Sequence, residues 1–211
     1  MIWEKIVKND ALINLNRSYK LCKEDLSVEA KHRCVYCCIH ESRWGGIRNF
    51  HVEHYKPKSI FTEDINNYNN LFYACSVCNG FKGNDWPNDQ QPTFDVAFYP
   101  NPIEYNYSEL IQVDYENGNV RGNNFTANYI IEKLYLNRRQ LINERIFYWY
   151  NKKFLDTLPL FQEYIKILLR NSQNEKTKKL LEKFFEHQCK ISKLYADLNT
   201  MIPYKKQDIS R

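Results

Sequence analysis

The sequence predicts an α+β fold in which a small, cysteine-rich core lies between an N-terminal helical segment and a mostly α-helical C-terminal half. Two C-x-x-C pairs mark the core, a short alternating run between them indicates a strand, and helical periodicity dominates after residue 121. We therefore expect three regions: a helical segment over residues 1–30, the core with a proline-rich crossing segment over residues 31–109, and a hairpin followed by basic helices over residues 110–211.

The core is expected to contain a strand followed by a knuckle and a helix. Residues 47–55 are expected to form this strand, because Phe50 and Val52 alternate with His51 and Glu53. Such a strand places His51 and Glu53 on one side and His54 on the other. Residues 70–83 are then expected to form a knuckle that opens into a short helix.

The C-terminal half is expected to begin with a hairpin. Asn117-Gly118, between alternating residues, predicts its turn within residues 110–120. The helical pattern that follows should be broken at Pro159. The chain has a net charge of +5, but residues 121–211 carry 18 basic and 9 acidic side chains. This bias favours an acidic partner such as nucleic acid, although solvated helix faces explain it equally well.

Composition excludes several classes of protein. The 211 residues are 43% hydrophobic and 15% aromatic, which is enough apolar surface for a core and excludes a wholly disordered chain. No apolar run approaches the length of a membrane-spanning helix. The first residues do not resemble a signal peptide, so we expect a cytoplasmic chain without a membrane partner. Cysteines in that compartment stay reduced and tend to serve metals or catalysis.

The two C-x-x-C pairs predict a structural zinc site. Four thiolates complete a tetrahedral zinc shell, and two such knuckles supply Cys34, Cys37, Cys75 and Cys78. Cys38 directly follows the first pair, but the two-residue spacing favours Cys37 as the ligand. His32 and His40 flank this pair and remain alternative ligands.

The joint pattern of these motifs resembles the HNH nuclease family, which has the ββα-metal fold, in its variant braced by a four-cysteine zinc. That family has C-x-x-C, then an acidic residue and His followed by x-x-Pro, then Asn-Leu, then C-x-x-C-Asn-x-x-Lys. This chain supplies the same order over residues 34–83 with Cys34, Cys37, Glu53, His54, Pro57, Asn70, Leu71, Cys75, Cys78, Asn79 and Lys82.

The resemblance implies a role for each matching residue. His54 would be the general base that activates water, and Asn70 would orient it. Glu53 and Asn79 would hold a catalytic Mg²⁺ or Mn²⁺. The family often has His where this chain has Asn79, and a neutral amide favours hard Mg²⁺. His51 shares the strand face of Glu53, so a third metal ligand, a phosphate contact and a structural hydrogen bond all remain open for it.

The same resemblance suggests phosphate contacts and a biological setting. Lys82, Lys56 and Lys58 are candidate nucleic-acid contacts, and DNA is the expected substrate. Two segments, residues 53–59 and 130–138, also resemble HNH proteins of bacterial anti-phage systems, above all the Septu-type and retron-associated nuclease subunits. Those subunits work beside an ATPase of the ABC/SMC type. The alternative is a non-catalytic zinc module that only binds nucleic acid or a protein partner.

Overall fold

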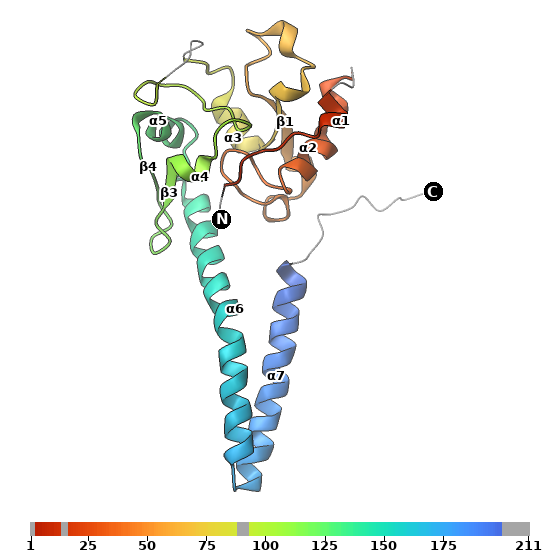
Figure 1. Ribbon diagram of the computed structural model, residues 1–211, viewed down its shortest axis with the longest axis vertical. Helices are drawn as coiled ribbons and strands as arrows, with labels where there is room; N and C mark the ends of the chain where they lie inside the picture. Colours follow the sequence, from red (N-terminus) through yellow and green to blue (C-terminus); the bar gives the residue numbers. More distant parts are fainter. Residues whose placement is uncertain (1–2, 14–16, 88–92, 200–211) are drawn as a thin grey trace, which may run out of the picture. The chain divides into compact units, whose positions relative to one another are not determined.

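The computed structural model describes residues 3–13, 17–87 and 93–199. They form the expected α+β fold, with helices α1 to α7 and two small antiparallel sheets (Figure 1). The chain divides into two compact units, of which the first runs to Ile146 and the second begins at Phe147. Over the described ranges, no helix combines the length and the apolar character that a membrane crossing requires.

The N-terminal segment is helical only in part. It contains α1 (Asp10–Ile13) and α2 (Lys23–Glu29), whereas residues 3–9 form no helix. Trp3 is buried, and its indole Nε1 donates a hydrogen bond to the carbonyl oxygen of Tyr36 at 2.9 Å. Tertiary contact therefore overrides the helical pattern here, because an extended segment brings Trp3 onto the first cysteine knuckle.

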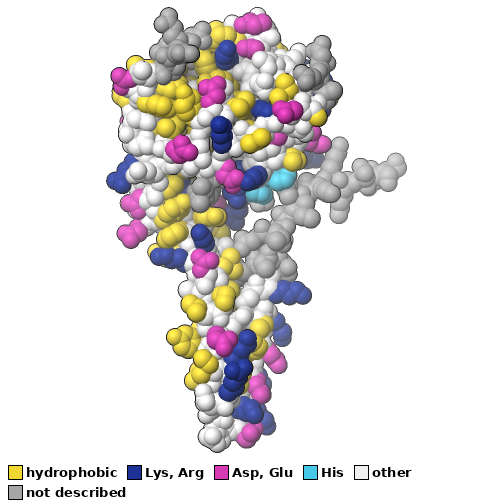
Figure 2. Space-filling view, viewed as in Figure 1, with side chains coloured by type: hydrophobic (Ala, Val, Ile, Leu, Met, Phe, Trp, Pro, Cys, Tyr) yellow, Lys and Arg dark blue, Asp and Glu magenta, His cyan; other side chains and the backbone are white. Residues whose placement is uncertain are grey.

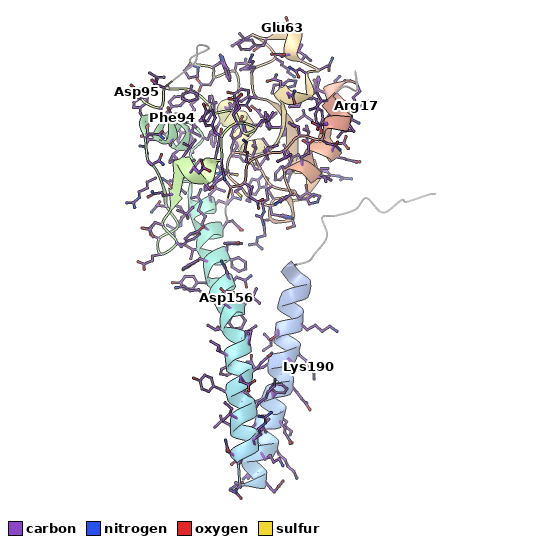
Figure 3. All side chains as sticks on the ribbon, in the orientation of Figure 1. Arg17, Glu63, Phe94, Asp95, Asp156 and Lys190 are labelled. Atoms are coloured by element: carbon purple, nitrogen blue, oxygen red, sulfur yellow. The ribbon has the colours of Figure 1, made fainter. Side chains whose placement is uncertain are left out.

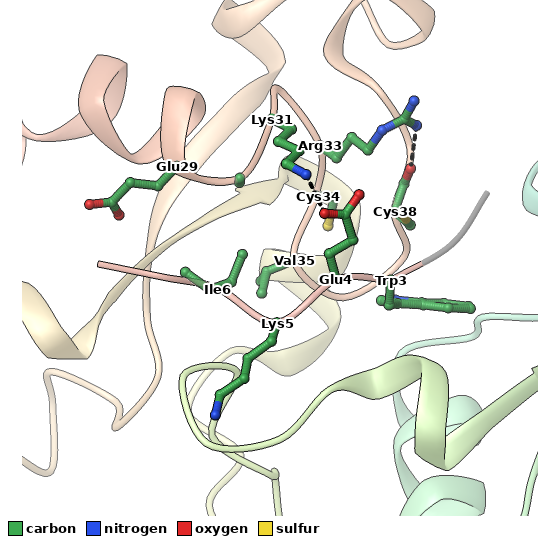
Figure 4. A pocket seen from close by; sticks show the side chains of 11 residues that line it. Trp3, Glu4, Lys5, Ile6, Glu29, Lys31, Arg33, Cys34, Val35 and Cys38 are labelled. Carbon is green, nitrogen blue, oxygen red and sulfur yellow. Dashed lines mark hydrogen bonds and ion pairs between the residues drawn. The ribbon is translucent and has the colours of Figure 1, made fainter. Parts of the chain in front are cut away.

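Figure 4 shows this extended segment crossing the loop that carries the first cysteine pair. Glu4 forms an ion pair with Lys31, and the guanidinium of Arg33 donates to the carbonyl oxygen of Cys38 at 3.2 Å. The cavity between the extended segment and this loop has a volume of about 40 Å³. It has room for no more than a few water molecules, so the segment closes one side of the knuckle.

The core sheet pairs β1 (Phe50–His54) with β2 (Leu71–Cys75) in antiparallel fashion, and α3 (Ser76–Lys82) follows β2 without a loop. The strand expected over residues 47–55 is thus confirmed in its central part, while residues 47–49 form a 3₁₀ turn. All five residues of β2 are buried, and its register with β1 places His54 opposite Leu71.

The second sheet is the predicted hairpin. It pairs β3 (Ile111–Val113) with β4 (Val120–Gly122), and the turn contains Gly118 at a φ of +76°. Asp114 stabilises the turn because its carboxylate accepts from the backbone N–H of Glu116 at 3.0 Å. The neighbouring helices in the sequence are α4 (Tyr107–Leu110) and α5 (Phe125–Lys133).

The last two helices are α6 (Arg139–Asn171) and α7 (Glu175–Asn199). The expected break at Pro159 is wrong, because α6 continues through this residue. Proline removes one backbone hydrogen bond from a helix interior, which is destabilising by itself. Here Leu158 and Ile165 are buried on either side of it, and this packing offsets the lost bond.

Arg145 ties the first turns of α6 to the hairpin. Its side chain is fully buried and donates to the carbonyl oxygen of Gly118 at 3.0 Å and to that of Leu136 at 2.7 Å. Burial lowers the pKa of this guanidinium to about 10. The first unit therefore includes the start of α6, held by a buried charge with backbone partners.

Candidate metal centre and adjoining polar cavity

Four buried cysteines gather where the first knuckle meets the end of β2 and the start of α3. Their sulfur atoms all lie within 4.8 Å of one another in the cluster Cys34, Cys37, Cys75 and Cys78. Zn–S bonds of about 2.3 Å place the sulfurs of a tetrahedral site about 3.8 Å apart. The Sγ atoms of Cys37 and Cys75 are 3.8 Å apart. The four cysteines therefore fit a metal such as zinc.

The alternatives for this cluster are settled by position. Cys38 is buried but does not belong to the cluster. The Nδ1 of His32 forms a hydrogen bond with the hydroxyl of Ser27 at 2.9 Å, and the Nδ1 of His40 forms one with the hydroxyl of Ser42 at 2.8 Å. Both rings are thus engaged in local hydrogen bonds, and the two-residue spacing predicted the correct sulfur.

Arg138 contacts the cluster from the segment between α5 and α6. Its Nη2 lies 3.6 Å from the Sγ of Cys78 and 4.0 Å from the Sγ of Cys75. A guanidinium beside thiolates offsets their negative charge, and the nearby cysteines raise the pKa of Arg138 although burial opposes this. Sequence spacing did not predict this contact, because 60 residues separate Arg138 from Cys78.

A polar cavity of about 450 Å³ opens beside β1 and α3. Five residues selected from the sequence line it: His51, Glu53, His54, Lys58 and Asn79. Among the other selected residues, Asn70, Lys56 and Lys82 do not line the cavity. The antiparallel pairing and the immediate start of α3 bring the histidine-bearing strand and the asparagine-bearing helix to one place.

A backbone hydrogen bond sets the tautomer of the His54 ring. Its Nε2 lies 3.0 Å from the carbonyl oxygen of Ile65, and a carbonyl only accepts, so Nε2 carries the proton. Nδ1 is then the basic nitrogen of the ring. Burial lowers the pKa of His54, which keeps the imidazole neutral near pH 7. The rings of Tyr19 and His54 pack in a T-shaped arrangement, with 4.8 Å between their centroids.

Glu53 is almost completely buried and takes part in an ion pair. The ammonium of Lys82 lies 2.7 Å from its Oε1, and the hydroxyl of Tyr36 donates to the same oxygen at 3.1 Å. Oε2 is the carboxylate oxygen that these two contacts leave for a cation. Burial raises the pKa of Glu53, and the ion pair with Lys82 opposes this only in part.

The sequence predicted a phosphate contact for Lys82, but the structure pairs this side chain with Glu53. Lys82 is 1% exposed, and its ammonium also donates to the carbonyl oxygen of His54 at 3.0 Å. It therefore holds the end of β1 against α3 from the inside. Asn79 and Lys82 are three residues apart on α3, a spacing that places two residues near one face of a helix, but Asn79 lines the cavity while Lys82 turns into the core.

Asn70 acts on the loop between the strands and not on the His54 ring. Its Oδ1 accepts from the backbone N–H of Lys56 at 2.7 Å, and its Nδ2 donates to the carbonyl oxygens of Lys56 at 3.1 Å and Asp64 at 3.2 Å. The next carbonyl along the chain, that of Ile65, is the one that holds His54. Asn70 thus positions His54 indirectly through this loop.

The lysines around the cavity include two that sequence reasoning missed. Lys20 and Lys23 line it together with Lys58, which lies 5.1 Å from the centroid of the Tyr19 ring. Lys56 stands outside it, with its ammonium 3.7 Å from Asp64. Nothing in the sequence marks Lys20 and Lys23, because only the fold brings the 3₁₀ turn Tyr19–Leu21 and α2 to the cavity beside β1.

His51 is exposed and lines the cavity. In the described part of the chain, the cysteine cluster is the only group of three or more His, Cys, Asp or Glu side chains placed closely enough to hold a metal. A second cation at the cavity would therefore rely on Glu53 and the Asn79 amide, with water completing its shell. No protein-family model, curated protein or solved structure matches this chain.

Proposed function

We propose that this protein is a metal-dependent endonuclease of the HNH type, which hydrolyses phosphodiester bonds of nucleic acid. The observation that carries the proposal is the cavity that unites His54, with Nδ1 as its basic nitrogen, with Glu53 and Asn79. The scaffold around it, β1, β2 and α3 beside a four-cysteine cluster, agrees with the order of motifs in the sequence.

His54 is the proposed general base. A neutral imidazole takes a proton from water near pH 7, and a positioned base of this kind contributes about 10²–10⁴ in rate. The carbonyl of Ile65 holds the ring through Nε2, so the proton acceptor is Nδ1. The loop that supplies this carbonyl is held by Asn70, which makes Asn70 a positioning residue.

The proposed ligands of a catalytic cation are Glu53, through Oε2, and Asn79, with His51 as a third candidate. Carboxylate and amide oxygens are hard donors, which suits Mg²⁺ or Mn²⁺ with several waters. When bound, such a cation supplies charge stabilisation at the phosphate and the leaving oxygen. The structural metal proposed at the four cysteines is zinc, which holds the two knuckles together.

The lysines at the cavity are the proposed phosphate contacts. Lys20, Lys23 and Lys58 surround the groups above, so a polyanion that enters meets three ammonium groups. Contacts of this kind bind the backbone of nucleic acid without selecting a sequence. We propose DNA as the substrate, and the basic residues after 121 add to the attraction.

The alternative is a non-catalytic zinc module, and one observation favours it. The ion pair with Lys82 already neutralises Glu53, so the carboxylate is not an unpaired charge that demands a metal. The two functions differ in what His54 does, because a binding module has no need for a base.

Cleavage by matched histidine variants separates them. His54→Ala should abolish nicking of supercoiled plasmid in Mg²⁺ or Mn²⁺ while zinc content and circular dichroism stay unchanged. His40→Ala is the control, since His40 lies outside the cavity and bonds only locally. Equal cleavage by His54→Ala and the unaltered protein would refute the assigned base, and no cleavage by the unaltered protein under any divalent ion would favour the binding module.

The proposed setting is anti-phage defence beside an ATPase of the ABC/SMC type, which rests on the sequence resemblance of residues 53–59 and 130–138. We expect an ATPase of this type to be encoded next to this chain, and deletion of residues 173–211 should reduce its recovery more than it reduces zinc content. Equal recovery by full-length and truncated chains would exclude these residues as its docking region.

A further inference from the structure

The second unit is a pair of helices that buries little of its apolar surface. Along α6, the least exposed residues recur at alternating spacings of three and four: Leu155, Leu158, Gln162, Ile165 and Leu169. Leu158 and Ile165 are buried in this seam, and Gln162 reaches α7, because its Nε2 donates to the hydroxyl of Ser192 at 3.4 Å. Alternating spacings of this kind are typical of a coiled-coil seam.

A second row of apolar residues runs along α6, and most of its members come one residue before a member of the first seam. It contains Tyr150, Phe161, Tyr164 and Leu168, which are all exposed. Displacement by one residue turns a position by about 100° around a helix, so this seam lies to one side of the packed one. The helix is therefore apolar over more of its circumference than α7 covers.

The same arrangement occurs on α7. Leu180, Phe184 and Ile191 are exposed at spacings of four and seven. The rings of Phe161 and Phe184 lie 5.7 Å apart, which shows that the two exposed seams meet on the same side of the helix pair. An apolar cavity of about 420 Å³, lined by Phe161, Tyr164 and Gln188 among others, lies along this side.

These seven side chains form what we call the apolar face. Figure 2 shows apolar side chains reaching the surface along α6 and α7, and Figure 3 draws the side chains of both helices, with the charged Asp156 and Lys190 labelled. The members of the apolar face remain between 38% and 69% exposed. With about 200 Å² for a large side chain, the face exposes about 700 Å².

That area exceeds what a monomer ordinarily leaves exposed. The largest apolar patch on a typical monomer is about 300–600 Å², whereas one partner of a standard protein interface buries about 800 Å². The apolar face thus has the size of one half of a stable interface.

We propose that the occupant of the apolar face is the same face of a second copy of this chain. Two antiparallel helices with matching seams, related by a two-fold axis to an identical pair, form a four-helix bundle. Such an interface is self-complementary and closes, so it covers both faces without leaving a new one.

The mass of the full-length protein tests this proposal. Sedimentation velocity and light scattering on the unaltered chain should give twice the 25.5 kDa of one chain at micromolar concentration. Tyr164→Glu/Leu180→Glu places a charge on each seam at residues that are now exposed, so folding of the single chain is preserved. The dimer dissociation constant should rise at least about 100-fold.

Lys152→Glu is the matched control, because it changes the net charge by the same two units on an exposed residue of α6 outside the face. It should stay dimeric, and circular dichroism should show equal helix content for all three proteins. A monomeric unaltered chain at about 100 µM would overturn the proposal. So would a dimer that survives the double substitution, because its interface would then lie elsewhere.

Discussion

Replacement of Lys82 by methionine should destabilise the protein in a way that depends on pH. The substitution keeps a side chain of similar length but removes the ammonium that lies 2.7 Å from the buried Glu53 carboxylate. Removal of one partner from a buried ion pair typically costs about 3–5 kcal/mol, because the remaining charge has no compensation.

Protonation of Glu53 sets an upper limit on this cost. Each pH unit above the ordinary pKa of 4.5 adds about 1.4 kcal/mol to the free energy needed to neutralise the carboxyl. The limit is therefore about 4 kcal/mol at pH 7.5 and about 1.4 kcal/mol at pH 5.5. Burial raises the pKa of Glu53 and Lys82 lowers it, so loss of the ammonium raises this pKa further in the folded state. The folded variant therefore takes up its proton at higher pH, and it gains stability relative to the unaltered protein as the pH falls.

Denaturant unfolding of the zinc-loaded protein at both pH values, without added Mg²⁺, measures the effect. Lys82→Met should lose about 4 kcal/mol at pH 7.5 and markedly less at pH 5.5. In the double variant Lys82→Met/Glu53→Gln most of the loss at pH 7.5 should disappear, since the uncompensated charge is gone. Lys56→Met is the control, because its ammonium is partly exposed and 3.7 Å from Asp64, and it should cost less than about 1 kcal/mol. An equal loss at both pH values, or no recovery in the double variant, would refute the reasoning.

Three further outcomes are expected. Because burial lowers the pKa of His54, the acid limb of the cleavage rate against pH should lie below 6.5, and a midpoint above 7 would contradict the neutral base. Arg138→Gln should accelerate transfer of zinc to a chromogenic chelator several-fold relative to the unaltered protein, whereas Arg138→Lys should restore part of the retention because it keeps the charge beside the sulfurs. Gly118→Ala should cost more than about 2 kcal/mol in urea unfolding, since its φ is +76° and a Cβ would lie 2.5 Å from the carbonyl oxygen of Ile142, while Gly80→Ala, in open space on α3, should be neutral or stabilising.

Local patterns in the sequence predicted the elements that local physics controls. The two-residue spacing of each cysteine pair identified the four sulfurs that meet, because a tight knuckle needs that spacing wherever it occurs. Asn117-Gly118 identified the hairpin, since a glycine adopts the positive φ of such a turn without strain. The alternating residues within 47–55 identified β1, because successive side chains of a strand point to opposite faces.

Tertiary structure decided what depends on neighbours distant in the chain. Pro159 stays helical because packing of Leu158 and Ile165 outweighs one missing backbone hydrogen bond. Residues 3–9 are extended because Trp3 finds a partner on the first knuckle.

The site shows the same division. The order of motifs, through its resemblance to the HNH family, predicted that His54, Glu53 and Asn79 act together, and all three line one cavity. It did not determine that Lys82 would turn inward, because a lysine is buried only where a carboxylate compensates it, and that compensation depends on how α3 packs on β1. Arg138 reaches the cysteine cluster, and Lys20 and Lys23 reach the cavity, for the same reason: long-range packing brings together side chains that no spacing along the chain relates.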